Sequence, residues 1–170
     1  LVLSAAPVRT GPAIADGLVV VAGDDGRVRA VDEATGVVVW EADLGTPIRS
    51  SPALHLGRAL VATYGGRIAA LDLATGAPLW SVGTRSTELS SPCVRGTIQI
   101  QGSGFPNPEV VARDLRTGGV LFRAPLEQHS YSSIAASPAA LYVGANDGGL
   151  YALDPDTGAR QWLFPTAGSF

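Results

Sequence analysis

One eleven-residue pattern occurs four times in this 170-residue chain and constrains its fold more than any other feature. The pattern is Ala-x-Asp-x-x-Thr-Gly-x-x-x-aromatic, in which the last residue is Trp or Phe. Its aspartates are spaced by 40, 42 and 40 residues, and a period of this length is typical of propeller blades and other stacked repeats. The four copies contain Asp32 and Trp40, Asp72 and Trp80, Asp114 and Phe122, and Asp154 and Trp162.

Each period contains short apolar or alternating segments between turn signals. In the first period these segments are GPAI, GLVVVAG, GRVRAVD and GVVVW. The 21 Gly and 12 Pro residues fall at short intervals, so no segment is long enough for a convincing amphipathic helix. This pattern predicts a four-stranded antiparallel meander. We therefore predict an all-β chain of four such blades.

The residues of the repeated pattern have structural roles in such a blade. Thr-Gly closes a tight turn between the third and fourth strands, in which Gly accepts a positive φ. The Asp carboxylate can accept hydrogen bonds from backbone amides of that turn. The aromatic residue places a large flat surface on the outer strand, where it can pack against the next blade. We interpret the four aspartates as supports of the turn and not as catalytic carboxylates.

The repeated pattern resembles the tryptophan-docking repeat of the quinoprotein (PQQ-like) β-propellers. That family includes quinoprotein alcohol dehydrogenases, the propeller lipoprotein of the outer-membrane barrel-assembly machinery, and sensor-like extracellular domains of bacterial kinases. The resemblance covers the whole chain and implies a periplasmic or extracellular location. It divides residues 1–170 into PQQ-like blades at about 1–40, 41–80, 81–122 and 123–162, with 163–170 beginning the next.

The sequence departs from the family pattern in the third and fourth repeats and in the number of blades. Phe122 replaces Trp, and Ile134 stands where the earlier repeats have Pro12, Pro52 and Pro92. Propellers of this family usually close with seven or eight blades. Three alternatives are a fragment of a longer propeller, two chains completing an eight-bladed ring, and closure with four blades. An open array leaves strand edges and an apolar blade face uncovered, so we favour two chains completing a ring, or a piece of a ring.

Composition excludes several classes of function. Charged residues make up 16% of the chain and the net charge is −3, which does not match a nucleic-acid binder or a polybasic membrane anchor. No apolar run approaches the roughly 20 residues of a membrane span, and LVLSAAPVRT lacks the basic start of a signal peptide. A single cysteine, Cys93, excludes an internal disulfide, and with only His55 and His129 beside it there is no zinc-ligand set.

Two sets of loops are expected to share one face of a propeller made of these blades. They are the loops between second and third strands and the loops between blades, whereas the Thr-Gly turns lie on the opposite face. The third repeat has the longest of the first set, GSGFPNPE at 102–109, and loops that outgrow their register often carry function. We predict Phe105, Asn107 and Glu109 as partner-binding residues. An insertion without function fits the sequence equally well.

The segments entering each first strand are expected near the central axis. Arg9, Arg49 and Tyr131 share one repeat position there, which Leu89 fills in the third blade, and His129 precedes Tyr131 by two residues. Because a guanidinium fork matches a carboxylate, Arg9, Arg49, Tyr131 and His129 are candidate ligand-binding residues in a central funnel. The alternative is a solvated, hydrogen-bonded rim of the channel.

Catalytic patterns are weak in this sequence. The family's dehydrogenases supply a calcium site and a catalytic carboxylate from insertions between blades, and such insertions are not apparent here. Asp154 and Asp156 in DPDTG suggest Ca²⁺, but an oxygen cage needs about six to eight ligands, and a turn explains the pair better. We expect no catalytic residue, no metal, and neither PQQ nor Ca²⁺ as a cofactor.

The sequence thus favours a non-enzymatic propeller scaffold that binds a protein or peptide partner. It would be the sensor or docking domain of a larger bacterial envelope or signalling protein. The alternative is a receptor for a small quinone-like or carboxylate ligand at the funnel, and a third hypothesis is a fragment of a quinone-dependent dehydrogenase. The expected assembly is a homodimer or part of a longer propeller, without nucleic-acid binding or membrane insertion.

Overall fold

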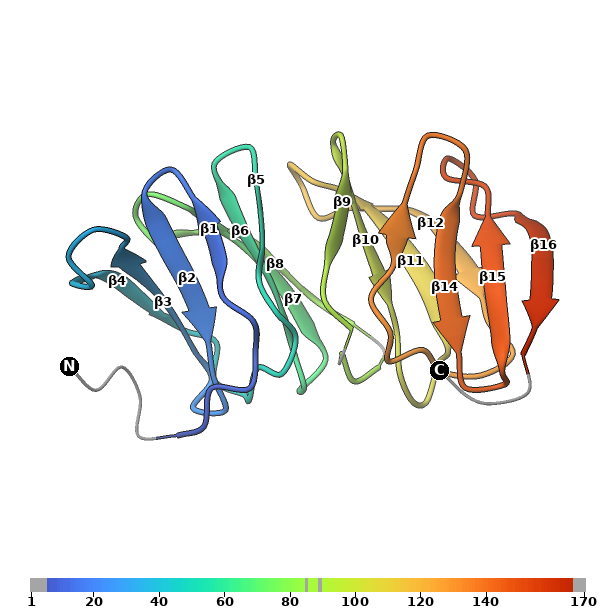
Figure 1. Ribbon diagram of the computed structural model, residues 1–170, viewed down its shortest axis with the longest axis horizontal. Coiled ribbons are helices and arrows are strands. Elements are labelled where there is room, and N and C mark those ends of the chain that lie inside the picture. The colour runs from blue at the N-terminus through green and yellow to red at the C-terminus, as the bar shows by residue number, and fades with distance from the viewer. Residues whose placement is uncertain (1–5, 85, 89, 167–170) are drawn as a thin grey trace.

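The computed structural model describes residues 6–84, 86–88 and 90–166, which form four antiparallel sheets of four strands each (Figure 1). In every sheet the strands are hydrogen-bonded in chain order, as a meander. The described residues form no helix. The prediction of an all-β fold built from four propeller blades is therefore confirmed.

The strand bounds repeat closely from blade to blade. Blade one contains β1 (Ala13–Ala15), β2 (Leu18–Ala22), β3 (Arg27–Asp32) and β4 (Val38–Asp43). Blade two contains β5 (Ala53–His55), β6 (Arg58–Thr63), β7 (Arg67–Asp72) and β8 (Pro78–Gly83). Blade three contains β9 (Cys93–Arg95), β10 (Ile98–Gly102), β11 (Glu109–Asp114) and β12 (Val120–Pro125). Blade four contains β13 (Ala135–Ala136), β14 (Leu141–Ala145), β15 (Gly149–Leu153) and β16 (Arg160–Pro165).

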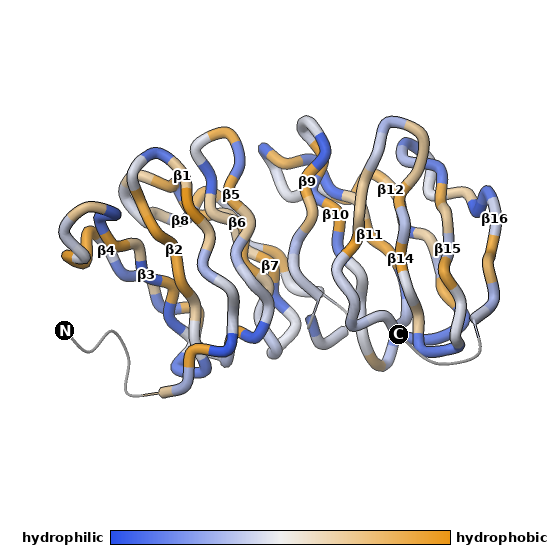
Figure 2. Tube along the Cα trace, viewed as in Figure 1, coloured by the Kyte–Doolittle hydropathy of each residue, from blue (hydrophilic) through white to orange (hydrophobic). Residues whose placement is uncertain are grey.

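The blades follow one another along the long axis of the molecule (Figure 1). The short first strands contact one another in sequence, β1 with β5, β5 with β9 and β9 with β13. The first strands therefore form the inner wall, and each fourth strand lies at the outer edge of its sheet. Figure 2 shows that apolar residues recur along the strands while the turns are mostly polar.

The Thr-Gly turns have the same hydrogen bonds in all four blades. In blade one, Asp32 Oδ1 accepts from the amide of Thr35 at 2.8 Å and from its hydroxyl at 2.6 Å, and Gly36 has a φ of 70°. The hydroxyl bond, followed by the amide bond, lowers the pKa of this carboxyl. The pKa values of the other three turn aspartates, Asp72, Asp114 and Asp154, are lowered by the equivalent bonds.

The tryptophans join neighbouring blades at contacts that we call seams. Trp40 of blade one donates from Nε1 to the carbonyl of Leu73 in blade two at 2.8 Å, and a Cβ at Gly76 would lie 2.6 Å from its ring. Trp80 repeats the contact on Leu115 at 2.8 Å, over Gly118. Because no side chain larger than glycine fits beneath the indole, Gly76 and Gly118 also form the docking surfaces for the preceding blades.

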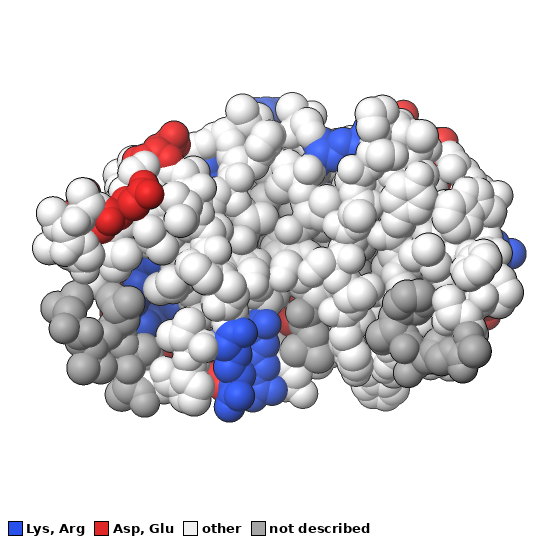
Figure 3. Space-filling view, in the orientation of Figure 1, with Lys and Arg blue, Asp and Glu red and all other residues white. Residues whose placement is uncertain are grey.

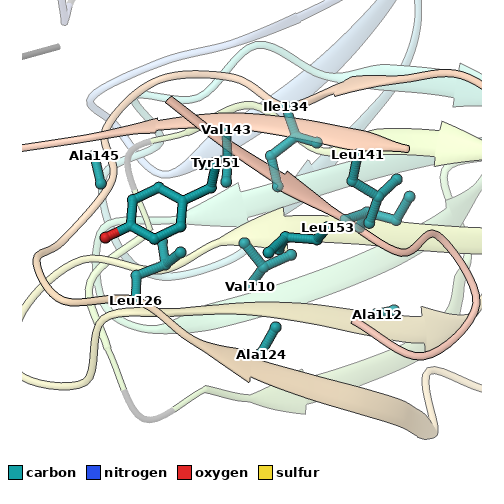
Figure 4. Packing of buried hydrophobic residues seen from close by; sticks show 11 residues of the cluster. Val110, Ala112, Ala124, Leu126, Ile134, Leu141, Val143, Ala145, Tyr151 and Leu153 are labelled. Atoms are coloured by element: carbon teal, nitrogen blue, oxygen red, sulfur yellow. The ribbon is translucent and has the colours of Figure 1, made fainter. Parts of the chain in front are cut away.

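The hydrophobic core is divided among the seams. Val20, Ala30 and Trp40 of blade one form a cluster with Val61 and Leu71 of blade two. Another cluster lies between blades three and four, and Figure 4 shows its side chains in the space between the strands, with the ring of Tyr151 at one end. Stability is therefore distributed over contacts between adjacent blades, as in other repeat proteins.

The third seam differs from the first two because Phe122 replaces Trp. The Phe122 ring packs on Gly158, because a Cβ added at Gly158 would lie only 2.5 Å from it. Unlike an indole, a phenyl ring has no N–H to donate. A cavity of about 480 Å³ remains beside this contact, and its lining includes Ala124, Leu153 and Gly158.

Candidate functional site

Backbone hydrogen bonds place the two predicted sets of loops on one face. The amide of Tyr64, between second and third strands, donates to Pro47 in the loop between blades at 2.8 Å, and Asn146 donates to His129 in the same way at 3.0 Å. On the opposite face the Thr-Gly turns bind the turns between first and second strands, for example Leu73 to Gly57 at 2.9 Å. We call the first of these the loop face.

Arg9 and Arg49 converge on one carboxylate of the chain itself. Arg9 Nε donates to Asp24 Oδ2 at 2.8 Å, and Arg49 Nε donates to Asp24 Oδ1 at 3.2 Å. The hydrogen bond from Arg9 is the largest cause that lowers the pKa of Asp24. Figure 3 shows one group of basic side chains at the lower edge of this view, while other basic side chains are scattered over the surface. The two arginines predicted to share a repeat position thus lie together and already hold a carboxylate.

The other two predicted funnel residues form a second pair. The rings of His129 and Tyr131 lie 4.6 Å apart at 44°, and His129 Nε2 lies 2.6 Å from Asn146 Nδ2. No contact among the described residues joins this pair to Arg9 or Arg49. Leu89, which fills the position in the third blade, lies outside the described residues.

The longer loop of the third repeat folds back on the segment between blades two and three. The carbonyl of Phe105 accepts from the amide of Thr87 at 3.2 Å, and the carbonyl of Asn107 accepts from the Ser86 hydroxyl at 3.1 Å. The Phe105 side chain is 71% exposed. Glu109, at the start of β11, forms an ion pair with Arg123. The loop is thus anchored through its backbone and presents Phe105 to solvent.

A groove of about 420 Å³ runs between this loop and the second blade on the loop face. Tyr64 and Gly66 line one side, and Phe105 and Pro106 line the other. Hydroxyl-bearing residues also line it, namely Thr84, Ser86 and Thr87. The groove therefore has aromatic walls and hydrogen-bonding groups between them, which is an arrangement suited to an extended peptide or a small apolar ligand.

Of the two aromatic residues that line the groove, Phe105 is a predicted partner-binding residue and Tyr64 was not singled out from the sequence. The signal was present, because Tyr64 is at the turn position that Asp24 occupies in blade one and Asn146 in blade four. An aromatic residue at a position where other repeats have a polar turn residue is unexpected, and it points to a function other than closing the turn.

The aromatic surface continues from the groove towards blade four. A Cβ at Gly104 would lie 2.8 Å from Thr87 Oγ1 and 3.3 Å from Tyr131 Cε1, so the loop packs closely between these two residues. Tyr64, Phe105 and Tyr131 are exposed by 41%, 71% and 42%. We call these three residues the aromatic arc.

A buried polar layer lies within blade three and the segment before it. Glu88 is fully buried, accepts a hydrogen bond from Ser103 at 3.4 Å, and has its pKa raised by burial to about 7. Arg113 is 2% exposed, and burial lowers its pKa although the charge of Glu88 opposes that shift. Within the described part of the chain, Glu88 Oε2 and Arg113 Nε have no hydrogen-bond partner. This layer was not predicted from the sequence.

The residues that suggested a calcium site do not form a joint cage. Asp154 Oδ1 accepts from the amides of Asp156 and Thr157, whereas Asp156 pairs with Arg95 at 3.0 Å. The described residues contain no group of three or more His, Cys, Asp or Glu side chains placed to hold a metal ion. They also form no helix that is long and apolar enough to cross a membrane.

Four-stranded blades joined through tryptophan indoles define a β-propeller repeat domain. The aromatic groove lies on the loop face of this domain. The family model described as outer membrane protein assembly factor BamB matches residues 3–126 and 98–169, and the chain belongs to this family of PQQ-like repeats. The predicted family is therefore confirmed. A comparison with curated protein sequences gives no significant match.

Solved structures of two kinds share this fold. BamB from Moraxella catarrhalis is 22% identical, with a TM-score of 0.80 over 92% of this chain and 48% of that chain. A quinohemoprotein alcohol dehydrogenase from Pseudomonas putida HK5 is 21% identical, with a TM-score of 0.84 over 94% of this chain and 34% of that chain. The computationally designed Ika8 protein is 21% identical, with a TM-score of 0.83 over 93% of this chain and 49% of that chain. The chain thus spans half or less of the length of these proteins.

Proposed function

We propose that this chain is a non-enzymatic propeller scaffold that binds an extended segment of a protein partner across its loop face. The observation that carries this proposal is the groove between Tyr64 and Phe105, continued by Tyr131 as the aromatic arc. Tyrosine and other aromatic residues are enriched in protein interfaces, where truncation of a central one often has a large effect on affinity.

The chemistry of the groove fits an extended peptide. Aromatic walls at Tyr64 and Phe105 provide apolar contact area. The hydroxyl groups of Thr84 and Thr87 donate to Ser86 and Phe105, and their oxygens can still accept hydrogen bonds from peptide amides. The walls have fixed supports, because the backbone of Phe105 is bonded to Thr87 and the Tyr64 amide is bonded to Pro47. A rigid site of this kind lowers the ordering cost of binding.

The family description supports a protein partner and an envelope location. The matching family model is described as an outer membrane protein assembly factor, and one similar structure is BamB. We therefore propose a location in the bacterial envelope and a role as a docking domain of a larger assembly.

The funnel is a weaker candidate than the groove. A carboxylate ligand there would compete with Asp24, which both arginines already bind. The groove requires no such displacement, so the contacts of the described residues favour the groove over the funnel as the binding site.

A phage-displayed library of random linear peptides provides a direct test. Peptides selected on the wild-type chain should bind the Phe105→Ala variant at least about tenfold more weakly, which corresponds to about 1.4 kcal/mol. Leu121→Ala is the matched control, because Leu121 is 53% exposed but lies on β12, in the outer strand. Selected peptides that bind all three proteins equally would refute the groove as the site.

A further inference from the structure

The seams within the chain provide a template for contacts beyond it. At each of the first two, a Trp indole donates to a backbone carbonyl one residue after the turn Asp and covers the turn Gly. Trp40 and Trp80 are only 7% and 9% exposed as a result. Each seam thus consists of a donor half on one blade and an acceptor half on the next.

The donor half on blade four has no acceptor among the described residues. Trp162 is at the register position of Trp40 and Trp80, yet it is 46% exposed. Its described ring contact is Tyr142 of its own sheet, at a centroid distance of 5.8 Å. Phe164, two residues further along β16, is 61% exposed. Blade four therefore presents an uncovered aromatic face at one end of the row of blades (Figure 1).

The acceptor half on blade one is also uncovered. A Cβ at Gly36 would meet no described atom within 4 Å, whereas the equivalent position at Gly76 is 2.6 Å from an indole. Glu33 has the register position of Leu73, and its amide donates to Gly17 at 2.9 Å just as Leu73 donates to Gly57 at 2.9 Å. The turn backbone of blade one is therefore bonded like that of an occupied acceptor.

The charged side chain at this end of blade one is already buried within the single chain, because Arg29 is 7% exposed. Arg29 is bonded within its own blade, to Asp25 at 2.8 Å and to Glu41 at 2.6 Å. In blade four the equivalent positions hold Tyr151 and Asp147, which are hydrogen-bonded to each other at a formed seam. Covering Arg29 with another blade would leave its charge paired, and a buried charge is tolerated only when it is paired.

We propose that two copies of this chain join head to tail into an eight-bladed ring, in which Trp162 of each copy docks on Gly36 and the Glu33 carbonyl of the other. One copy has both halves of the contact on opposite end faces, so two copies form two identical seams and the ring closes. The similar folds support this size, because this chain covers 48% of BamB and 49% of the designed Ika8 protein.

The test is the absolute mass in solution, measured by light scattering on a sizing column over a range of concentrations. The wild-type chain should give twice 17.4 kDa. Trp162→Ala and Gly36→Ala should each weaken the dimer at least tenfold. Gly57→Ala is the control for Gly36→Ala, because Gly57 has a similar positive φ of 68° and open space around it. Circular dichroism should show that all variants keep the wild-type strand content.

Mixing the two variants distinguishes a head-to-tail ring from other dimers. A mixed pair of Trp162→Ala and Gly36→Ala chains retains one wild-type seam, in which the intact Trp162 meets the intact Gly36. The mixture should therefore dimerise more tightly than either variant alone. A wild-type monomer at every concentration, an open series of larger assemblies, or a dimer that neither substitution weakens would overturn the proposal.

Discussion

The guanidinium carbon of Arg49 lies 4.9 Å from the centroid of the Tyr64 ring, and the same side chain donates to Asp24 at 3.2 Å. Asp24 also binds Arg9, so Arg9, Asp24, Arg49 and Tyr64 form one connected row on the loop face. The arginines that resembled ligand-binding residues in the sequence therefore support one wall of the aromatic groove.

Substitution of Arg49 should weaken peptide binding through Tyr64. A cation–π contact at an exposed site contributes about 0.5–1 kcal/mol, so Arg49→Ala should raise the Kd of a groove-binding peptide by about two- to fivefold. Arg9→Ala is the matched control, because Arg9 binds the same carboxylate but has no described contact with Tyr64. Fluorescence titration of a labelled peptide measures both. A larger loss for Arg9→Ala would place the ligand in the funnel instead.

Glu88 should make the protein less stable as pH rises. Its pKa is about 7 in the folded chain against 4.5 ordinarily, so the unfolded state loses the proton first. The free energy that protonated Glu88 contributes to folding is fully present below pH 4.5. The free energy of unfolding then falls by about 3 kcal/mol as pH rises from 4.5 to 7. The turn aspartates do not interfere, because their pKa values lie below 3.8. Urea unfolding from pH 4.5 to 8 measures this slope.

Glu88→Gln provides the control for that slope. An amide of similar shape does not titrate, so the difference in unfolding free energy between Glu88→Gln and wild type should change in favour of Gln as pH rises to 7. The diagnostic quantity is this change with pH and not the absolute stability of the variant, because Arg113 faces a charged Glu88 only where Glu88 is deprotonated. An unchanged difference across this range would show that Glu88 is not protonated in the folded chain.

Replacing Phe122 by Trp, the residue that the other repeats have, should stabilise the third seam. Phe122→Trp places an indole N–H opposite the carbonyl of Pro155, which has the register position of Leu73 and Leu115. A pocket of about 480 Å³ lies next to this contact. One additional hydrogen bond should stabilise the fold by about 1 kcal/mol. Trp80→Phe, the reverse change at the second seam, should cost about 1–3 kcal/mol because Leu115 loses its donor. Destabilisation by Phe122→Trp in urea would refute the equivalence of the seams.

Gly76 should tolerate a side chain much less well than Gly57. Both have a positive φ, 73° and 68°, which costs an alanine about 1–2 kcal/mol. Only at Gly76 would the new Cβ meet an indole, that of Trp40, and such overpacking adds about 1–3 kcal/mol. Chemical denaturation of both alanine variants isolates the indole contact. Equal losses at the two positions would mean that Trp40 does not restrict this turn.

The repeated pattern was sufficient to predict the fold because its residues act locally. Asp32 bonds Thr35 three residues away, and Trp40 reaches a turn that recurs at a fixed distance along the chain. The longer third loop also directed attention to Phe105, since a change of length is visible in an alignment of repeats.

The remaining features depend on contacts between blades that no single repeat encodes. Tyr64 forms a wall only because Arg49, from the preceding loop, packs on its ring. Glu88 and Arg113 are both buried, although charged residues are mostly exposed in folded proteins, so their sequence positions gave no reason to expect burial.

The position of a bound peptide on the loop face is the most direct test of peptide binding in the groove. Backbone amide chemical shifts of the labelled chain should be recorded during titration with the tightest peptide selected from the library. The largest changes should fall on Tyr64, Thr87 and Phe105. Changes confined to Arg9, His129 or the outer strands, or a library that yields no binding peptide, would contradict binding in the groove.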